Sequence, residues 1–296
     1  MRFRSTVLAL SVAVFASSCA SDGSSGGLLI TNEQEAELGL GVDMEIEKEF
    51  KILDTTDPLH EWANQLVAKL ADGAKGFRDP AEFGGYKVEV IADDKLVNAF
   101  AAPGGYTYIT TGLILQAQSC GAIAGVLGHE LGHVTERHGV KQMEKAIIAQ
   151  GLLDIFLKDG LAKEVATVAA SIVLSTKFSQ EAEKESDSVG LQVAYNAGYN
   201  PYGLVDFFQV LLAEEAKQGG SPPAFLSSHP TTQSRISAIT AEIEAKYGDK
   251  VNPKVTQTYE CVGTTLTLAA AQQRIKDQQL TVKAGTGLAP KKREQP

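Results

Sequence analysis

Apolar residues recur every three or four positions through most of this chain, which is the spacing of helices that bury one face. The first such stretch begins at Thr31, a residue type that often caps helices. A second begins at Asp57 with a proline directly after it, and we expect it to end at Gly73. The pattern therefore predicts a body made mainly of helices.

Two stretches depart from this spacing. Residues 86–91 and 106–110 alternate or are β-rich, and the extended segment Asn98, Ala99, Phe100 and Ala101 leads into a Pro-Gly-Gly turn between them. We expect a small sheet here, and an exposed strand edge can pair with an extended peptide. Residues 98–101 are accordingly interpreted as a substrate-binding strand. The alternative is a hairpin that only supports the next helix.

Helical spacing returns further along the chain. We expect a mostly apolar helical region from Lys141 to Leu174, broken near Lys158–Gly160, and further helices after residues 178, 199 and 231. A short helix near residues 268–279 precedes a polar tail, Gly285–Pro296, which we expect to be disordered.

Candidate chemistry lies in an HExxH motif at residues 129–133, inside the apolar run 120–134. Because four residues of helix turn about 400°, His129 and His133 point the same way and can share one Zn²⁺ at roughly 2.0–2.1 Å. Glu130 then lies beside the first ligand, where it can accept a proton from a metal-bound water. The alternative is a buried helix with two incidental histidines.

Acidic residues on a later helix can complete such a site. Glu183 and Asp187 are four residues apart and share one helix face. Two histidines and one carboxylate leave the fourth zinc position open for water, and Asp187 could accept the spare N–H of a ligand histidine. Glu181 and Glu185 compete for the ligand role, and all four acids could instead form a solvated helix face.

Three more polar side chains bear on this site. His138 falls five residues past His133, about 500° around a helix that we expect to continue to Gly139, so we interpret it as a structural or surface residue. His229 could donate to an oxyanion or reach the metal, and Arg235 could support the site electrostatically. A single histidine before a proline is more often a turn residue, which is the alternative for His229.

Composition narrows the range of partners. The 296 residues are 44% hydrophobic and 21% charged, which is ordinary for a globular protein with a large core. The net charge is −9 at pH 7, and no basic stripe is present to neutralise phosphates. We therefore expect no nucleic-acid partner.

The N-terminus is typical of an exported lipoprotein. A basic start and an apolar stretch too short to span a bilayer end in Ala-Ser-Ser-Cys, which resembles a bacterial lipobox. We expect a signal peptide at 1–18, lipidation of Cys19, and a flexible tether at 19–30. By resemblance to lipoprotein sorting in diderm bacteria, the absence of an Asp directly after the cysteine implies the periplasmic face of the outer membrane. The alternative is a soluble periplasmic protein.

Two cysteines remain, Cys120 and Cys261. An oxidising compartment permits a disulfide that would join the C-terminal region to the metal-binding helix. Two separate buried thiols are equally compatible with the sequence.

Together these residues resemble the M48 (HtpX-like) zinc metallopeptidases, particularly periplasmic lipoprotein members, from about Thr31 to Lys246. The resemblance is carried by the segment 98–105, the sequence GHELGH at 128–133, Arg137-His138, the acidic segment 183–190, and His229-Pro230 with Arg235. Ser186 replaces the alanine that is usual in the acidic motif.

The resemblance implies a predominantly helical α+β, zincin-like (gluzincin) domain at 31–247, with a small sheet beside the HExxH helix and a C-terminal extension at 248–296. It also implies one zinc ion per chain on His129, His133 and Glu183. Asp187 would orient the site, and His229 corresponds to a histidine that holds some members latent.

We therefore expect a zinc endopeptidase that cleaves extended or misfolded envelope proteins, with Glu130 as general base. The alternative from another class is a non-proteolytic or latent chaperone-like lipoprotein that binds outer-membrane protein clients through the same groove. A third possibility is a metal-dependent hydrolase that acts on a non-peptide substrate, because the metal site alone does not specify the substrate. The oligomeric state is left open.

Overall fold

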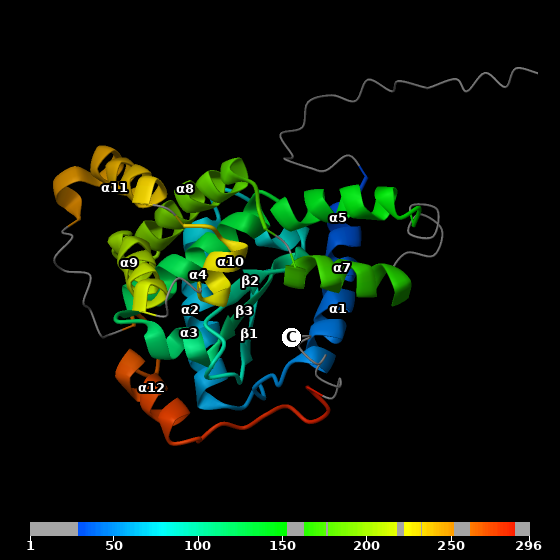
Figure 1. Cartoon of the computed structure of the whole chain (residues 1–296), viewed down its shortest axis with the longest axis horizontal. Helices are drawn as coiled ribbons and strands as arrows, with labels where there is room; N and C mark the ends of the chain where they lie inside the picture. The colour runs from blue at the N-terminus through cyan, green and yellow to red at the C-terminus, as the bar shows by residue number, and fades with distance from the viewer. Residues whose placement is uncertain are drawn as a thin grey trace, which may run out of the picture.

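A three-stranded sheet lies at the centre of the molecule, with helices on both of its faces (Figure 1). The computed structural model describes residues 29–152, 163–175, 177–217, 222–231, 233–251 and 261–287. The expected signal peptide, Cys19, most of the expected tether and the expected helix break at Lys158–Gly160 lie outside these residues.

The sheet contains β1 (Lys87–Ile91), β2 (Ala99–Ala101) and β3 (Tyr106–Thr110) in the order β1–β3–β2. β3 pairs parallel with β1 and antiparallel with β2, so β2 is an edge strand. A short 3₁₀ turn, η2 (Pro103–Gly105), joins β2 to β3. All five residues of β3 are buried, as expected of a central strand.

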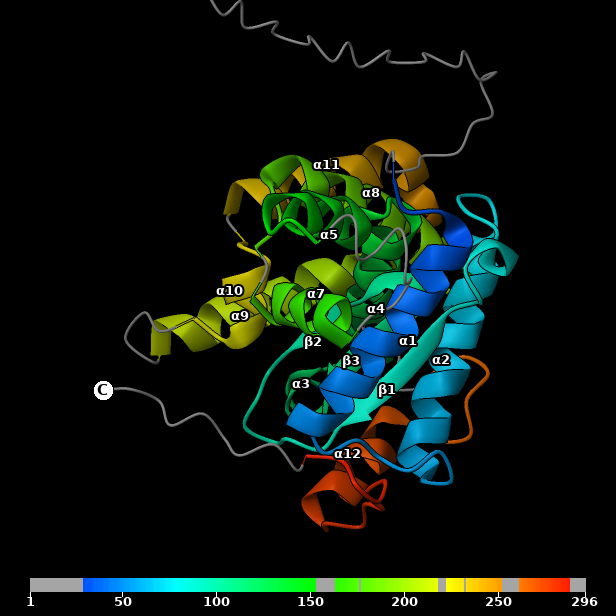
Figure 2. The same ribbon diagram turned by 90° about the vertical axis from the view of Figure 1, so that its right-hand side faces the viewer.

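Alternate residues of the strands point to opposite faces of the sheet and build two apolar cores. On one face, Val88, Val90 and Ile109 contribute to a core formed with α2 (Pro58–Ala74), α4 (Cys120–Thr135), α8 (Gln180–Asn196), α9 (Tyr202–Lys217) and α11 (Gln233–Tyr247). On the other, Phe100 and Tyr108 pack with α1 (Asn32–Glu49), α5 (His138–Ala149) and α7 (Lys163–Ser175). Figure 2 shows α1 and α7 on this side of the sheet.

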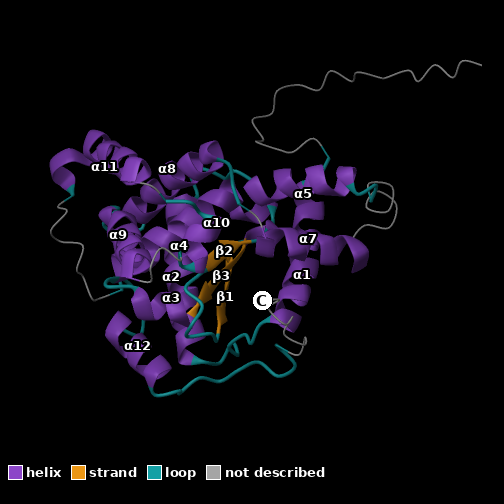
Figure 3. Cartoon of the chain, in the orientation of Figure 1, coloured by secondary structure: helices purple, strands orange, loops and turns teal. Residues whose placement is uncertain are grey.

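Short elements connect these layers. They are η1 (Pro80–Glu82), α3 (Thr111–Gln116), α10 (Ala224–Ser228), η3 (Gly248–Lys250) and α12 (Leu268–Lys276). Helices dominate the described residues (Figure 3), and the expected α+β fold with a small sheet beside the HExxH helix is confirmed. No helix within the described ranges has the length and apolarity that crossing a bilayer requires.

Local capping signals start the helices where the sequence predicts. Thr31 forms a reciprocal capping box with Gln34 at the start of α1, and Asp57 accepts a hydrogen bond from the backbone of α2. Ser119 and Ser179 cap α4 and α8 in the same way. The two helices that carry the candidate metal ligands therefore have well-defined beginnings.

The structure corrects the expected length of the HExxH helix. α4 ends at Thr135, Arg137 adopts the left-handed conformation with φ 55°, and α5 begins at His138. This conformation is unfavourable for a residue with a Cβ, and the buried side chain of Arg137 stabilises it by long-range contacts. Its Nε lies 2.8 Å from the Glu35 carboxylate, and one terminal nitrogen donates to the carbonyl of Ile30 at 2.7 Å.

The described C-terminal residues pack onto the same body. A disulfide joins Cys120, the first residue of α4, to Cys261, and α12 contributes apolar side chains to the core around α2 and α4. Thr286 accepts a hydrogen bond from the backbone of Ile52 at 3.2 Å. Residues 285–287, which we expected to be disordered, are thus placed against the body, and residues 288–296 lie outside the described part.

Candidate metal centre

The site depends on a close crossing of α4 and α8. A Cβ at Gly190 would lie 2.7 Å from the backbone nitrogen of His129, and a Cβ at Gly132 would lie 2.7 Å from the carbonyl oxygen of Ser186. Only glycine allows the two backbones to approach this closely. The hydroxyl of Ser186, at the position where the acidic motif usually has alanine, donates a hydrogen bond to the His129 carbonyl and so links the two helices.

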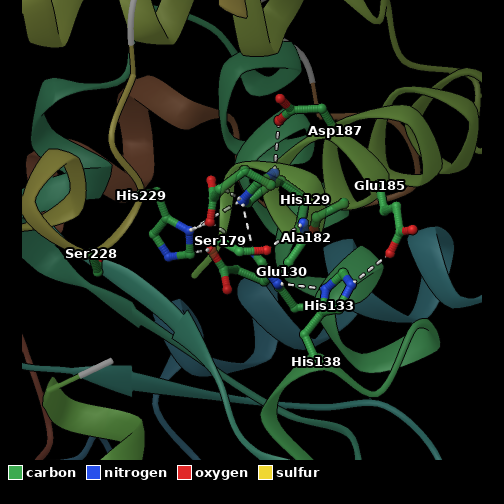
Figure 4. Close-up of polar contacts among 12 residues, drawn as sticks. His129, Glu130, His133, His138, Ser179, Ala182, Glu185, Asp187, Ser228 and His229 are labelled. Atoms are coloured by element: carbon green, nitrogen blue, oxygen red, sulfur yellow. Dashed lines mark hydrogen bonds and ion pairs between the residues drawn. The ribbon is translucent and has the colours of Figure 1, made fainter. Parts of the chain in front are cut away.

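Four buried donors meet beside this crossing: His129, His133, Glu183 and His229. Figure 4 shows the three histidines close together. One donor atom from each lies within 4.8 Å of all the others. His129 Nε2 lies 3.1 Å from His133 Nε2 and 3.2 Å from His229 Nδ1. Glu183 Oε1 lies 2.9 Å from His229 Nδ1 and 3.5 Å from His133 Nε2.

This donor set fits one zinc ion. Tetrahedral zinc with bonds of about 2.0–2.2 Å separates neighbouring ligand atoms by about 3.3–3.6 Å, close to the spacings between these atoms. Asp187 Oδ1 lies 2.9 Å from His129 Nδ1 and fixes the proton there, so His129 Nε2 presents a lone pair to the cluster. Buried lone pairs that converge in this way are stabilised by a cation.

Arg235 forms ion pairs with the two carboxylates of α8 at the cluster. Its guanidinium contacts both oxygens of Asp187, at 2.6 and 2.7 Å, and Glu183 Oε2 at 2.6 Å. Burial raises the pKa of Asp187, but hydrogen bonds from Arg235 and His129 outweigh burial and hold it below its usual range. Burial likewise raises the pKa of Glu183, and the neighbouring histidines outweigh it. Both carboxyl groups are therefore ionised and oriented.

The two competing acids of α8 lie elsewhere. Glu181 is exposed, and Glu185 points to His138, with 3.0 Å between its Oε2 and His138 Nε2. His138 is buried, and its Nδ1 lies 3.0 Å from His133 Nδ1, on the side of the ring away from the cluster (Figure 4). The sequence analysis did not predict this contact, because it assumed that one continuous helix carries both His133 and His138. The turn at Arg137 instead separates α4 from α5.

His229 lies within the donor cluster, so the alternative interpretation of this histidine as only a turn residue is wrong. It is 1% exposed, follows α10 directly, and its ring stacks on Phe225 with 4.8 Å between centroids. Burial lowers its pKa, but Glu130 and Glu183 outweigh burial and raise it. With His229 included, four protein donors surround one position, as in closed zinc sites.

Glu130 lies beside the cluster. Both of its carboxylate oxygens are buried without a hydrogen-bond partner among the described residues, and Oε1 is 3.5 Å from His229 Nε2. Burial raises the pKa of Glu130, since the charged form loses its hydration. A buried carboxyl group left without hydrogen bonds is available to exchange a proton with a bound molecule.

The expected substrate-binding strand divides into two parts. Asn98 directly precedes β2, and Ala99 begins it; neither borders the pocket described next. The Asn98 carbonyl accepts a hydrogen bond from the backbone of Thr110 at 3.1 Å, and Ala99 is in the core beside α4. Phe100 and Ala101 line a small pocket that His229 also borders. The edge strand and the cluster therefore face one pocket.

A phenylalanine that sequence reasoning overlooked also lies at the site. Phe178, from the segment before α8, stacks on the His133 ring with 3.9 Å between centroids, and it lines the same pocket as Phe100 and His229. Its place directly before Ser179 was the available signal, since Ser179 caps the helix that carries Glu183.

Comparisons with known proteins agree with this geometry. A family model described as peptidase family M48 matches residues 59–243, a range that contains all four donors, Glu130, Asp187 and Arg235. The beta-barrel assembly-enhancing protease of Yersinia pestis is 28% identical over 227 residues, covering 73% of this chain and 45% of the relative. The Escherichia coli K12 protein of the same name is 27% identical over 226 residues, covering 72% and 45%.

A more distant relative is the mitochondrial metalloendopeptidase OMA1 of Arabidopsis thaliana, 28% identical over 195 residues that cover 65% of this chain and 38% of the relative. The chain thus spans less than half the length of these three relatives. The match to the family model extends over more than half of the chain and includes the whole candidate site. This protein belongs to peptidase family M48.

Proposed function

We propose that this chain is a zinc-dependent endopeptidase that hydrolyses peptide bonds in extended or misfolded proteins of the bacterial envelope. The observation that carries the proposal is the buried convergence of His129, His133 and Glu183 beside Glu130, whose carboxylate accepts no hydrogen bond from the described residues. Membership of a peptidase family supports peptide bonds over other substrates. One zinc ion per chain would be held by the two histidines and Glu183.

The proposed chemistry divides among a few side chains. Zinc, when bound, would polarise the scissile carbonyl and lower the pKa of a water molecule. Glu130 takes a proton from the attacking water and returns it to the nitrogen of the leaving amine, a role that suits a carboxyl group whose pKa is raised by burial. Asp187 holds His129 in the tautomer that leaves Nε2 free, and Arg235 keeps Asp187 and Glu183 in place.

Substrate alignment is proposed to use the edge of the sheet. β2 is an edge strand, and an extended polypeptide can add to such an edge by backbone hydrogen bonds that do not depend on sequence. Phe100 and Ala101 would border the substrate, and Phe178 and Met143 make the pocket beside them apolar. We therefore expect a preference for extended chains with apolar side chains near the cleaved bond.

His229 supports a second candidate, a latent or non-proteolytic, chaperone-like protein. A hydrolytic zinc site keeps one position for water, whereas four protein donors close the site. His229 follows the short helix α10, so its withdrawal needs no change in α4 or α8. We propose that the resting protein is latent and that proteolysis requires His229 to leave the cluster.

Cleavage of unfolded casein tests both candidates. We expect Glu130→Gln to retain about one zinc per chain and to lose at least about 100-fold in rate, the usual contribution of a general base. His229→Ala should raise the rate above that of the unmodified protein, and adding Glu130→Gln to it should abolish the gain. Turnover retained in Glu130→Gln refutes the base assignment. Absence of cleavage in both the unmodified protein and His229→Ala favours the binding role.

The cellular setting is a proposal as well. Two of the relatives are named beta-barrel assembly-enhancing proteases, so we propose that the substrates include proteins of outer-membrane assembly. A lipid on Cys19 and a tether to residue 30 would hold residues 31–247, the proposed peptidase domain, at the periplasmic face of the outer membrane.

A further inference from the structure

The outer nitrogens of the two HExxH histidines have different partners. His129 Nδ1 faces the buried carboxylate of Asp187 at 2.9 Å. His133 Nδ1 has a histidine as its partner among the described residues, His138, whose Nδ1 is 3.0 Å away. His138 Nε2 in turn lies 3.0 Å from Glu185 Oε2. A chain of three side chains thus runs from the metal centre to the protein surface.

The position of each proton in this chain follows from the metal site. If His133 Nε2 binds zinc, the proton of its neutral ring is on Nδ1, and this N–H donates outward. His138 must then accept at Nδ1 and carry its own proton on Nε2, which donates to the Glu185 carboxylate. Each donor in the series meets an acceptor, so Glu185 selects the tautomer of His138, and His138 selects that of His133.

We propose that His138 and Glu185 are positioning residues that fix the ring orientation and tautomer of His133 and so raise the zinc affinity of the site. The inference rests on the proposed zinc site but not on proteolysis. It extends the site from α4 to the first residue of α5 and to an acid that is 57% exposed. With this assignment, Nδ1 of each HExxH histidine has a hydrogen-bonding partner, and that partner in turn contacts a charged side chain.

The turn at Arg137 explains how His138 reaches this place. On an uninterrupted helix His138 would point about 140° away from His133. The left-handed conformation of Arg137, stabilised by Glu35, separates α4 from α5, and the two rings lie 5.0 Å apart between centroids. A strained non-glycine residue that is over-determined by buried contacts is typical of functional sites.

Zinc affinity of the purified protein tests the proposal, measured by competition with a fluorescent chelator. We expect His138→Leu, which removes the acceptor, to weaken zinc binding by about 10–100-fold. His138→Asn should rescue most of the loss, because its Oδ1 can lie near the position of Nδ1 and accept the same proton. Glu185→Ala should weaken binding by about threefold to tenfold, and Glu185→Gln by less, because an amide oxygen still accepts. Glu181→Ala, an exposed acid one turn away, is the matched control and should change nothing.

The visible spectrum of the cobalt-substituted protein adds a readout that a purely structural role would not change. We expect His138→Leu to alter the Co²⁺ ligand-field bands and His138→Asn to restore them, while the melting temperature of the chelator-treated proteins stays within a few degrees. Should His138→Leu fail to fold, the surface variant Glu185→Ala gives the answer by itself.

The proposal is overturned if both His138→Leu and Glu185→Ala bind zinc as tightly as the unmodified protein, or if the unmodified protein binds no zinc. If the variants bind zinc more weakly as expected but the protein cleaves no substrate, the positioning role stands and the proposed peptidase activity is refuted. The two failures are therefore distinguishable.

Discussion

Asp43 provides a test of how burial affects this fold. It lies on α1 against the central strand, and the Tyr108 hydroxyl donates a 2.7 Å hydrogen bond to its Oδ1. Burial raises the pKa of Asp43 to about 6; the bond from Tyr108 opposes the shift, and the nearby charges of Glu89 and Glu47 add to it. An ordinary aspartate has a pKa of about 3.9.

The sign of the effect on stability follows from proton linkage. Between about pH 4 and pH 6 the folded protein holds more of this proton than the unfolded chain does, so the free energy of unfolding falls as the pH rises through this window. The contribution of Asp43 is therefore most favourable below pH 4. Above pH 6 the penalty for keeping its carboxylate charged and buried is constant.

The shift from 3.8 to about 6 would correspond to about 3 kcal/mol at 1.36 kcal/mol per unit. Because part of the side chain lies near solvent, we discount this and expect Asp43→Asn to stabilise the protein by about 1–2 kcal/mol at pH 7.5, and by roughly half as much at pH 5. For a chain of this size, the gain at pH 7.5 is about 2–6 °C in melting temperature.

Thermal unfolding at pH 5 and pH 7.5, with zinc present at the same concentration, measures this difference. Glu37→Gln is the matched control, because it removes an equal charge from an exposed position of the same helix and should give no pH-dependent gain. If Asp43→Asn lowers the melting temperature equally at both pH values, the carboxylate is stabilising and the reasoning from burial is wrong.

Three further predictions follow from the packing and the N-terminus. Gly190→Ala should lower the stability by about 1–3 kcal/mol and weaken zinc binding, because the added Cβ would lie 2.7 Å from the backbone of the HExxH helix. Thermal unfolding measures the loss of stability. Gly76→Ala is the control and should be neutral, because no atom lies within 4 Å of its added Cβ. Replacing Cys120 and Cys261 by Ser should cost about 2–5 kcal/mol of stability, an effect that excess reductant should reproduce in the unmodified protein and not in the variant. Cys19→Ala should move the mature protein from the membrane fraction to the soluble fraction, and unchanged sedimentation would argue against a lipid anchor.

Several features of the fold could be predicted from short stretches of sequence. The caps at Thr31 and Asp57, the five-residue strand from Tyr106 to Thr110 and the apolar helix around the HExxH motif are all present. Each depends on residues within one or two helical turns of one another, so the local pattern contains the relevant physical information. The family was recognised from motifs of the same short range.

Other features were not predictable from local pattern. The helix was expected to continue past His138, but it ends at Thr135, because contacts of Arg137 with Glu35 and Ile30, about a hundred residues earlier, stabilise a turn that the local sequence does not indicate. The order β1–β3–β2 and the burial of Asp43 likewise arise from packing between separate elements.

The spacing of residues along the chain was enough to predict which side chains share a helix face: His129 with His133, and Glu183 with Asp187. This is because the rotation per residue is a property of the helical backbone. The folded arrangement was needed to show that these two faces meet where α4 and α8 cross at glycines, that His229 joins them from a hundred residues away, and that Cys120 pairs with Cys261. These outcomes depend on how distant segments pack against one another, and the free energy of that packing is distributed over the whole core.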